Sequence, residues 1–461
     1  MTQTLTPRAA QQAGARVPGW VLPAVVVAGA GLRVWRATVN GMSFDESFTA
    51  VMGRRSVGGM LGFLRAHDSH PPLDYLLRMP LARLGAPDLV MRAPSLVFSI
   101  GALALFAWWM RTRGWVGVVA TALVAVSTFQ LVYGGEARMY ALLQLLGVAI
   151  AVVTESWLQQ PRPWHAWAIG ALLLVALLDH VSGFLLGAGL LLVAGRRTDG
   201  EAWRWRAATV AAGVVWAVLW GSAFVEQLHG SDTSWIPRTT PRGFMEVVAR
   251  HVTFTEGLAP LVFVAVVAGG VLLARSDRVT GRLWWCLGAV PFALAGVLGI
   301  FSSFLFDRVL SLSSWAAPLA VAVALGELWR RSRPVGTAIA AIALVAALAS
   351  SVSFLRQPWA YDRAIAHLDR VVQPGDVVVS YPARFGALVD WRIGVRGALA
   401  ATAVDVGLRD TDGVAVGSGD SGRVWLLVWV DGALDLRGLE RCAPTWTDGT
   451  TRILCIRTSV R

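Results

Sequence analysis

Polar residues that can do chemistry recur along this 461-residue chain at the ends of its apolar runs. Carboxylate and imidazole groups accept protons, and a guanidinium pairs with the oxygens of a phosphate. Ionisable groups are costly at membrane depth, so several of them gathered at one face indicate a functional site. The pairs are Asp45-Glu46, Asp68 with His70, Glu136 with Arg138, and Asp179 with His180.

The composition indicates a polytopic α-helical membrane protein. The chain is 55% hydrophobic and only 15% charged, whereas about a quarter of a soluble domain is charged. Apolar runs of about 20 residues, the length that crosses a bilayer, recur along most of the sequence. All 41 basic residues are Arg, and the formal charge is +12. Because these arginines are dispersed and form no stripe, they favour a topological role over nucleic-acid binding.

Reading about 17–22 residues per span, we predict about eleven transmembrane helices. The fifth and sixth are short and are interrupted at Asp179-His180. The predicted spans are 18–36, 89–110, 115–133, 138–157, 163–178, 181–196, 205–223, 257–274, 282–302, 307–327 and 334–355.

Arginines in alternate loops predict the orientation of these spans in the plasma membrane. By the positive-inside rule, those loops and the N-terminal tail 1–17 are cytoplasmic. The odd number of spans then places the C-terminus outside. The polar pairs fall in the other set of loops, so we expect them to share the extracytoplasmic side. The arginines are Arg111, Arg113, Arg162, Arg196, Arg197, Arg204, Arg206, Arg275, Arg278, Arg282, Arg330, Arg331 and Arg333.

Two outer loops of the transmembrane module 18–355 are long enough to shape a site. Loop 37–88 has apolar residues at roughly helical spacing with arginines between them, which predicts one or two amphipathic helices in the interface. Loop 224–256 is rich in Ser and Thr around Trp235, and such a loop often closes over a site. Trp235 and Asp68 are therefore predicted to contribute to a lid over the donor or the acceptor.

The sequence changes character after residue 355, and residues 356–461 predict a small extracytoplasmic α/β domain. Residues 359–373 form an amphipathic pattern with one apolar face. A turn at 373–376 leads into a first strand, and two more apolar runs follow. The apolar face consists of Ile365, Leu368, Val371 and Val372, and the strands are Val377–Val379, Val424–Val430 and Ile453–Ile456.

Two cysteines of this domain are predicted to face each other. Asp448-Gly449 is typical of a two-residue hairpin turn, which sets Cys442 opposite Cys455. In that register they would form a non-hydrogen-bonded pair, where the two strands approach most closely. An oxidising exterior would allow a disulfide, and two small buried thiols are the alternative. The third cysteine, Cys286, lies within a predicted helix and is expected to have only a packing role.

The order of the motifs resembles the GT-C membrane glycosyltransferases over most of the chain. The similar branches are the protein O-mannosyltransferases, the lipid A aminoarabinose transferases (ArnT-like) and related actinobacterial enzymes. Two departures are Asp74, where the family often has an aromatic residue, and Val181-Ser182 after His180, where aromatics are also common. The motifs are Asp45-Glu46, Asp68-Ser69-His70-Pro71-Pro72-Leu73, Arg92-Ala93-Pro94-Ser95, Glu136-Ala137-Arg138-Met139-Tyr140, Asp307-Arg308 and Trp359 with Pro374-Gly375-Asp376.

The resemblance implies an inverting glycosyltransferase that takes a sugar from a polyprenyl-phosphate carrier. The sugar would be a hexose or a pentose, such as mannose or arabinose, and the acceptor hydroxyl would belong to a glycan of the cell wall, a glycolipid or a protein. Nucleotide sugars are cytoplasmic, so an outward-facing transferase needs a lipid-carried donor. The implied cofactor stays open between none and a divalent cation (Mg, Mn, Ca or Zn), and membrane lipids are further partners.

The resemblance also implies the catalytic residues. Displacement of a phosphate by a hydroxyl needs a base to take the proton and positive charge to hold the leaving group. Asp45 is the implied base, and Glu46 beside it would orient the acceptor or bind a metal. The alternatives are a helix N-cap for Asp45 and a solvated loop charge for Glu46.

Four residues are implied to bind the donor phosphate: Arg138, His70, Arg308 and Tyr140. A guanidinium is suited to this role because its planar fork pairs with phosphate oxygens bidentately. Local ion pairs with Glu136 or Asp307 are the alternatives for the two arginines, and a turn histidine without a ligand is the alternative for His70.

The pair Asp179-His180 is implied to bind a divalent cation together with Glu46. A satisfied interfacial histidine is the alternative for His180.

A transporter or flippase of a lipid-linked or anionic substrate is the competing hypothesis from another class. Such proteins are expected to show internal repeats and helices interrupted near the membrane midplane. The sequence shows neither feature, and its polar pairs fall at one face. A structural scaffold would explain none of the paired acids.

Overall fold

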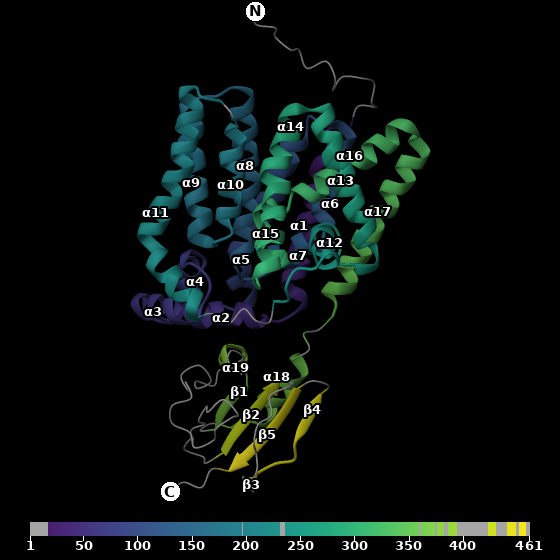
Figure 1. Cartoon of the computed structure of the whole chain (residues 1–461). Helices are drawn as coiled ribbons and strands as arrows, with labels where there is room; N and C mark the ends of the chain where they lie inside the picture. Colours follow the sequence, from purple (N-terminus) through teal and green to yellow (C-terminus); the bar gives the residue numbers. More distant parts are fainter. Residues whose placement is uncertain are drawn as a thin grey trace, which may run out of the picture. The chain divides into compact units, whose positions relative to one another are not determined.

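The computed structural model in Figure 1 describes residues 17–195, 197–230, 236–357, 359, 361–373, 376–381, 386–393, 423–429, 440–448 and 451–457. The chain divides into two compact units. The helical unit comprises Met1–Val39, Val57–Leu77 and Arg92–Arg356. The mixed unit comprises Asn40–Ser56, Arg78–Met91 and Gln357–Arg461.

The helical unit is that of a multi-pass membrane protein, as the hydropathy predicts. Helices form because, in lipid, every backbone N–H and C=O must be bonded within the segment. Within the described residues, seven helical segments are long and apolar enough to cross a membrane, and two bent pairs bring the number to nine. The seven are α1 (Val21–Val39), α5 (Asp88–Met110), α8 (Tyr140–Gln159), α11 (Gly200–Gly230), α13 (Ala259–Ser276) with η1 (Glu256–Leu258), the run of α14 (Arg278–Leu283), η2 (Trp284–Ala289) and α15 (Val290–Phe301), and α17 (Arg333–Leu355).

The two predicted short spans correspond to the apolar helices α9 (Pro163–Asp179) and α10 (Gly183–Ala194). The bent pairs are α6 (Gly114–Val126) with α7 (Thr128–Gly135), and η3 (Asp307–Ser313) with α16 (Ala316–Arg331). Each of the eleven predicted spans therefore has a helical counterpart.

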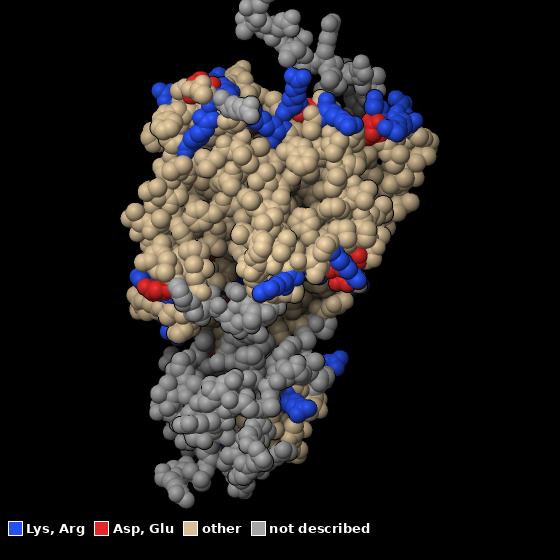
Figure 2. All heavy atoms as spheres, in the orientation of Figure 1, with Lys and Arg blue, Asp and Glu red and all other residues tan. Residues whose placement is uncertain are grey.

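Charge is distributed unevenly over the helical unit. Figure 2 shows basic side chains along one end of this unit, while the sides between the two ends are almost free of charge. The helix order places at this end the arginines that follow α5, α8, α10, α13 and α16. Many large apolar side chains on the sides are exposed, for example Val218 at 80% and Trp167 at 81%. An apolar belt beside a basic rim is the pattern that a membrane-spanning helical bundle requires.

The bend of 51° between α6 and α7 is stabilised by side chains from other helices. A broken helix leaves carbonyl groups without their usual partners. Here Arg33 of α1 donates to the carbonyls of Val124 and Ala125, each at 3.4 Å, and Ser351 of α17 donates to that of Val126 at 2.6 Å. The guanidinium of Arg33 also donates through Nε to Ser99 Oγ at 2.8 Å. These contacts hold α7 at an angle to α6.

The two long loops of the sequence analysis contain more helix than the sequence predicts. Loop 37–88 holds three helices instead of one or two: α2 (Phe44–Gly53), α3 (Val57–His67) and α4 (Leu73–Arg83). Of these, α2 belongs to the mixed unit and α3 to the helical unit. Loop 224–256 contains the short helix α12 (Pro241–Arg250), which packs on α13. Its C-terminal neighbour His251 is buried, stacks on Phe129 and accepts a hydrogen bond from Ser127 Oγ through its carbonyl.

The C-terminal part of the mixed unit is the predicted small α/β fold. Strand β1 (Val377–Tyr381) pairs in parallel with β2 (Arg423–Trp429), which pairs antiparallel with β5 (Thr451–Arg457). Strands β3 (Glu440–Arg441) and β4 (Trp446–Asp448) both pair with β5. Helix α18 (Asp362–Val371) packs its predicted apolar face on the sheet. Helix α19 (Gly386–Ile393) also belongs to this unit and packs on α2.

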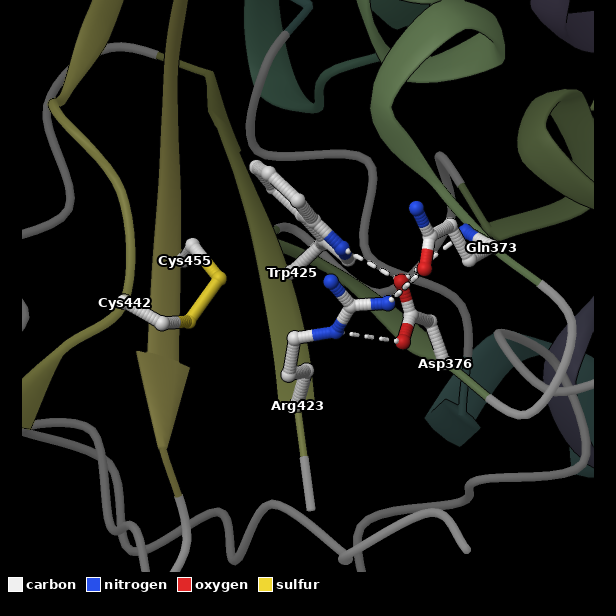
Figure 3. Close-up of a disulfide and its surroundings, with 6 residues drawn as sticks. All are labelled: Gln373, Asp376, Arg423, Trp425, Cys442 and Cys455. Carbon is white, nitrogen blue, oxygen red and sulfur yellow. Dashed lines mark hydrogen bonds and ion pairs between the residues drawn. A yellow bond between two sulfur atoms is a disulfide. The ribbon is translucent and has the colours of Figure 1, made fainter. Parts of the chain in front are cut away.

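Figure 3 shows that Cys442 and Cys455 form a disulfide, the first of the two predicted alternatives. Their Cα atoms lie 5.2 Å apart. The predicted non-hydrogen-bonded pairing is wrong, because Cys442 N donates to Cys455 O at 3.1 Å.

The predicted turn position is also wrong, because Asp448 pairs with Thr451 and is therefore a strand residue. The register shifts by two residues between Arg441, which pairs with Ile456, and Trp446, which pairs with Ile453. Gly449, the other predicted turn residue, lies outside the described part of the chain.

Asp376 joins the turn before β1 to strand β2. As Figure 3 shows, its carboxylate accepts hydrogen bonds from Arg423 Nε and Trp425 Nε1, both at 3.0 Å. It also accepts one from Gln373 N at 2.9 Å. The Pro-Gly-Asp motif thus ends in a residue with a structural role.

Candidate active site

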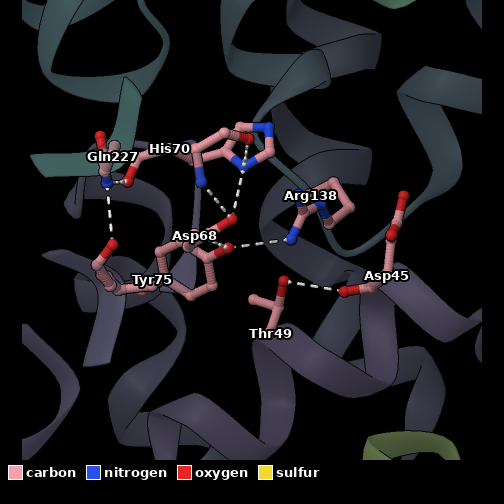
Figure 4. Close-up of polar contacts among 9 residues, drawn as sticks. Asp45, Thr49, Asp68, His70, Tyr75, Arg138 and Gln227 are labelled. Carbon is pink, nitrogen blue, oxygen red and sulfur yellow. Dashed lines mark hydrogen bonds and ion pairs between the residues drawn. The ribbon is translucent and has the colours of Figure 1, made fainter. Parts of the chain in front are cut away.

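Four polar side chains of the helical unit form a continuous hydrogen-bonded chain (Figure 4). Asp68 Oδ1 lies 3.0 Å from His70 Nδ1, and Asp68 Oδ2 accepts a hydrogen bond from the Tyr75 hydroxyl at 2.6 Å. The same hydroxyl accepts a hydrogen bond from Arg138 Nη1 at 3.2 Å. Tyr75 therefore connects the predicted lid residue Asp68 to the predicted phosphate ligand Arg138.

The loop between α3 and α4 holds Asp68 and His70 in place. Gln227 of α11 donates through Nε2 to the carbonyls of Leu64 and His70, at 2.9 and 3.2 Å (Figure 4). Pro71 and Pro72 follow His70 and restrict the backbone before α4 begins. The position of the imidazole is thus set by contacts on both sides of the loop.

The ionisation of Asp68 follows from its neighbours. Burial by itself raises the pKa of this carboxyl, but the charge and hydrogen bond of His70 oppose it, with smaller contributions from Arg138 and Tyr75. The opposing interactions are stronger together and lower the pKa of Asp68 to about 2. Burial also raises the pKa of Tyr75 well above its ordinary value. At neutral pH the pair is therefore a carboxylate and a neutral phenol that donates to it.

Arg138 lies on the turn between α7 and α8, and α5 fixes that turn. Ser95 Oγ donates to the carbonyl of Glu136 and lies 3.4 Å from the carbonyl of Arg138. On the same turn the carboxylate of Glu136 lies 4.0 Å from Arg36 of α1. Ser95 belongs to the Arg-Ala-Pro-Ser motif, so this motif positions the turn that carries Arg138.

The cluster continues through aromatic contacts to a second guanidinium. The ring of His180 lies 5.3 Å from that of His70 and 6.4 Å from that of Tyr140. The guanidinium of Arg308 lies 5.7 Å from the centre of the Tyr140 ring and 5.0 Å from that of Phe306. We call the connected set Asp68, His70, Tyr75, Arg138, Tyr140, His180 and Arg308 the polar cluster.

Asp307 beside Arg308 has a different set of partners. Its carboxylate accepts hydrogen bonds from the Tyr133 hydroxyl at 2.9 Å and from the backbone N–H of Arg308 at 2.8 Å. Arg250 of α12 lies 3.9 Å from the other oxygen. Asp307 thus joins α7, η3 and α12, and the guanidinium of Arg308 stacks on aromatic rings.

Sequence reasoning named Tyr140 but missed Tyr75 and Tyr133. The chain has only five tyrosines against 22 tryptophans, and three of the five, Tyr75, Tyr133 and Tyr140, lie in or next to the polar cluster. A phenol is both donor and acceptor, so it can link a carboxylate to a guanidinium. The scarcity of tyrosine in an apolar chain was a usable signal, because a buried hydroxyl needs a partner.

The predicted metal ligands do not form a coordinating set. The described part of the chain contains no group of three or more His, Cys, Asp or Glu side chains that could hold a metal ion. His180 Nδ1 accepts a hydrogen bond from the backbone of Ser182 at 3.0 Å, and Asp179 is completely buried at the end of α9. No step below depends on a divalent cation.

Asp45 and Glu46 lie on α2 in the mixed unit. The N-cap of α2 is Ser43, so the N-cap alternative for Asp45 is wrong. Glu46 is completely buried, so its solvated-loop alternative is wrong as well. Its carboxylate accepts a hydrogen bond from Ser43 N at 2.8 Å, and Ser43 Oγ accepts one from Glu46 N, which is a capping box. Asp45 lies between these two residues in the first turn, and its carbonyl accepts from Thr49 Oγ1 (Figure 4).

The last predicted site residue, Trp235, lies outside the described residues. The lid role of loop 224–256 and of Trp235 stays a prediction.

No protein-family model and no curated protein matches this sequence. Solved structures do match its fold. ArnT from Cupriavidus metallidurans bound to undecaprenyl phosphate has 14% identity and a TM-score of 0.58, over 95% of this chain and 98% of that one.

Two structures of oligosaccharyltransferases from Archaeoglobus fulgidus are also similar. One, in complex with Zn and sulfate, has 10% identity and a TM-score of 0.50, over 89% of this chain and 68% of that one. The other is AglB in complex with an inhibitory peptide and a dolichol-phosphate, with 11% identity and a TM-score of 0.51, over 82% and 64%.

The fold is therefore that of the GT-C membrane proteins, as the motifs predict. The similarity to ArnT extends over nearly the whole of both chains. At such low identities the likeness defines the fold only, and the activity has to be argued from the residues.

Proposed function

We propose that this protein is an inverting glycosyltransferase. It moves a sugar from a polyprenyl-phosphate-linked donor to an acceptor hydroxyl on the extracytoplasmic face of the plasma membrane. The observation that carries the proposal is the polar cluster, which gathers two guanidinium groups and two imidazoles at one end of an apolar helical bundle. The GT-C fold supports it, because the similar structures include proteins bound to undecaprenyl phosphate and to a dolichol-phosphate.

The polar cluster suits the phosphate of the donor. Arg138 and Arg308 supply N–H donors to its oxygens, and His70 and Tyr140 line the same place. The leaving group is a polyprenyl phosphate, which gains negative charge as the bond between the anomeric carbon and the phosphate oxygen breaks. Fixed positive groups in a region of low dielectric stabilise that charge. The long apolar tail would remain in the lipid beside the bundle.

The acceptor proton needs a base, and Asp45 is the residue that we assign to it. The acceptor oxygen bonds to the anomeric carbon from the side opposite the phosphate, so the configuration inverts, and the proton passes to the Asp45 carboxylate. Glu46 keeps its carboxylate on Ser43 N, so we assign it to holding the first turn of α2. Asp68 would orient His70 and, through Tyr75, Arg138.

The basic rim in Figure 2 supports the proposed orientation. Arginines accumulate on the cytoplasmic side, and the polar cluster lies at the other ends of the same helices.

The first experiment incubates the purified full chain with a panel of polyprenyl-phosphate sugars and measures released polyprenyl phosphate. We expect release with at least one donor. Asp45→Asn should lower that rate at least about 100-fold, the usual minimum contribution of a general base. Asp369→Asn, an exposed carboxylate in the same unit, is the matched control and should retain the wild-type rate.

Two results would contradict the proposal. Full turnover by Asp45→Asn would remove Asp45 from the mechanism. No release with any donor, combined with movement of an intact lipid-linked sugar across reconstituted vesicles, would favour the transporter alternative.

A further inference from the structure

A cavity at the basic end of the helical unit lies away from the polar cluster. It opens between the end of α5 and the end of α8 and has a volume of about 260 Å³. Its lining comes from the α5–α6 connection and from the last turns of α8. The lining residues are Trp108, Trp109, Arg111, Thr112, Arg113, Val152, Glu155, Ser156 and Gln159.

The inner wall of the cavity is electrically neutral. Glu155 accepts a hydrogen bond from Trp109 Nε1 and one from Arg113 Nη2, the latter at 2.6 Å. Arg113 also donates to Thr280 at 2.8 Å and lies 3.6 Å from Asp277. Both carboxylate oxygens of Glu155 are therefore occupied, and the charge of Arg113 is compensated.

Arg111 at the mouth of the cavity is different. Its guanidinium stacks on the Trp108 ring at 4.2 Å and donates to the Trp108 carbonyl. Among the described residues, no carboxylate forms an ion pair with Arg111. The charges of Arg111, Arg113 and Glu155 sum to one net positive charge in the lining of the cavity. The stacking holds this charge in place, because a guanidinium over an indole face loses less freedom than a free side chain.

The position of Trp108 near the end of α5 indicates which kind of anion can reach Arg111. Trp108 is 50% exposed and lies two residues before the end of α5, a candidate membrane span. A half-exposed tryptophan at a span end is typical of the level of the lipid headgroups. The outer face of α5 is apolar and exposed below it, for example at Val97. Acyl chains can therefore lie along α5 while a headgroup enters the cavity.

We propose that this cavity binds the phosphate headgroup of an anionic phospholipid. Basic pockets between membrane helices on the cytoplasmic side are suited to such headgroups. The phosphate pairs with Arg111, and the small hydroxylated part of the headgroup meets Thr112, Ser156 and Gln159. A volume of about 260 Å³ is below the usual range of drug-sized pockets, so a compact headgroup such as phosphoglycerol fits better than a large soluble ligand. This site is independent of the proposed transfer reaction.

The test uses the purified full chain and phosphatidylglycerol as the probe, with phosphatidylcholine as the zwitterionic lipid of equal chain length. Lipid retained by the protein is counted by native mass spectrometry. We expect the wild type to retain phosphatidylglycerol in preference, and Arg111→Gln to weaken that binding about fivefold. This factor corresponds to about 1 kcal/mol per cationic side chain near an anionic membrane.

Arg275→Gln is the matched control, because Arg275 is an exposed arginine at the same end but outside the cavity. It should bind phosphatidylglycerol as the wild type does. A thermal unfolding midpoint unchanged in Arg111→Gln shows that the loss comes from binding and not from misfolding.

Three results would overturn the proposal. The first is equal retention of phosphatidylglycerol by Arg111→Gln and the wild type. The second is equal retention of both lipids by the wild type. The third is displacement of the lipid by millimolar inorganic phosphate, which would assign the site to a soluble anion.

Discussion

The two ends of the helical unit use charge in opposite ways. At the basic end, several ion pairs join residues three or four positions apart on one helix, as in Glu327 with Arg330 and Arg331. At the other end, buried contacts in and next to the polar cluster join distant segments. Arg138 and Tyr75 are 63 positions apart, and Tyr133 and Asp307 are 174 apart.

This difference separates charges that orient a protein from charges that build a site. Exposed pairs within one helix contribute little to stability, so their positions are free to vary as long as the loop stays basic. Buried polar groups are tolerated only when each has a partner. The long-range ion pairs described at the basic end join Arg113 to Glu155 and to Asp277, and the pair with Glu155 supports the inner wall of the cavity.

The largest effect in this comparison is expected from Arg138→Met. Removing one fixed donor to developing charge lowers rates by about 100- to 1000-fold, so kcat/KM for the lipid-phosphate donor should fall by that factor. The release of polyprenyl phosphate at several donor concentrations measures it.

Arg330→Met at the basic end is the control for Arg138→Met. It also removes an arginine, but one that is 75% exposed, and it should leave kcat/KM unchanged. If both variants retained wild-type kcat/KM, the distinction between the two ends would have no functional meaning.

A second test concerns the bend between α6 and α7. Arg33→Met preserves the length of the side chain but leaves the carbonyls of Val124 and Ala125 without these hydrogen bonds. An unsatisfied buried group costs about 1–3 kcal/mol, so we expect the protein to be destabilised by about 3 kcal/mol. The thermal unfolding midpoint in detergent measures this loss.

Arg33→Lys is the graded comparison, because it retains the charge and can donate to one carbonyl. It should recover part of the lost stability. A midpoint for Arg33→Met equal to that of the wild type would show that the bend does not depend on Arg33.

How far the sequence predicts these features depends on the kind of interaction. Hydropathy predicts the spans because every span obeys the same requirement of length and apolarity. The motif order predicts that Arg138, His70 and Arg308 belong to one region. The bend at Ser127 cannot be predicted from the local sequence, because the side chains that stabilise it, Arg33 and Ser351, come from helices far away in the sequence.

One further feature that the sequence analysis missed, the role of Glu46, had a recognisable signal in the sequence. Ser43 and Glu46 have the spacing of a capping box, which already assigns the Glu46 carboxylate to Ser43 N. The hairpin register was wrong because local turn preference does not reveal the two extra residues between Cys442 and Trp446. Tyr75 was missed because attention to ionisable residues overlooks a neutral phenol that links two charges.

A smaller effect is expected from Asp68→Asn, and its size depends on pH. The folded protein lowers the pKa of Asp68 from its ordinary value to about 2. The carboxylate therefore stabilises the fold above pH 4, and this contribution disappears as the pH falls toward 2. We expect a loss of about 2 kcal/mol at pH 6, which becomes smaller below pH 4. Denaturation of both proteins from pH 3 to 6 tests this, and a difference that stays constant over the range would contradict it.

The smallest effect is expected from Glu327→Gln at the basic end. Its carboxylate pairs with Arg330 and Arg331 at 2.8 and 2.9 Å, but these arginines are 75% and 74% exposed. Water and salt screen such pairs, so the loss should be below about 0.5 kcal/mol and should vanish at high ionic strength. Asp68→Asn removes one carboxylate in the same way, so denaturation of the two variants in parallel isolates the effect of burial. A loss from Glu327→Gln as large as that from Asp68→Asn would mean that the basic end is also held together by its charges.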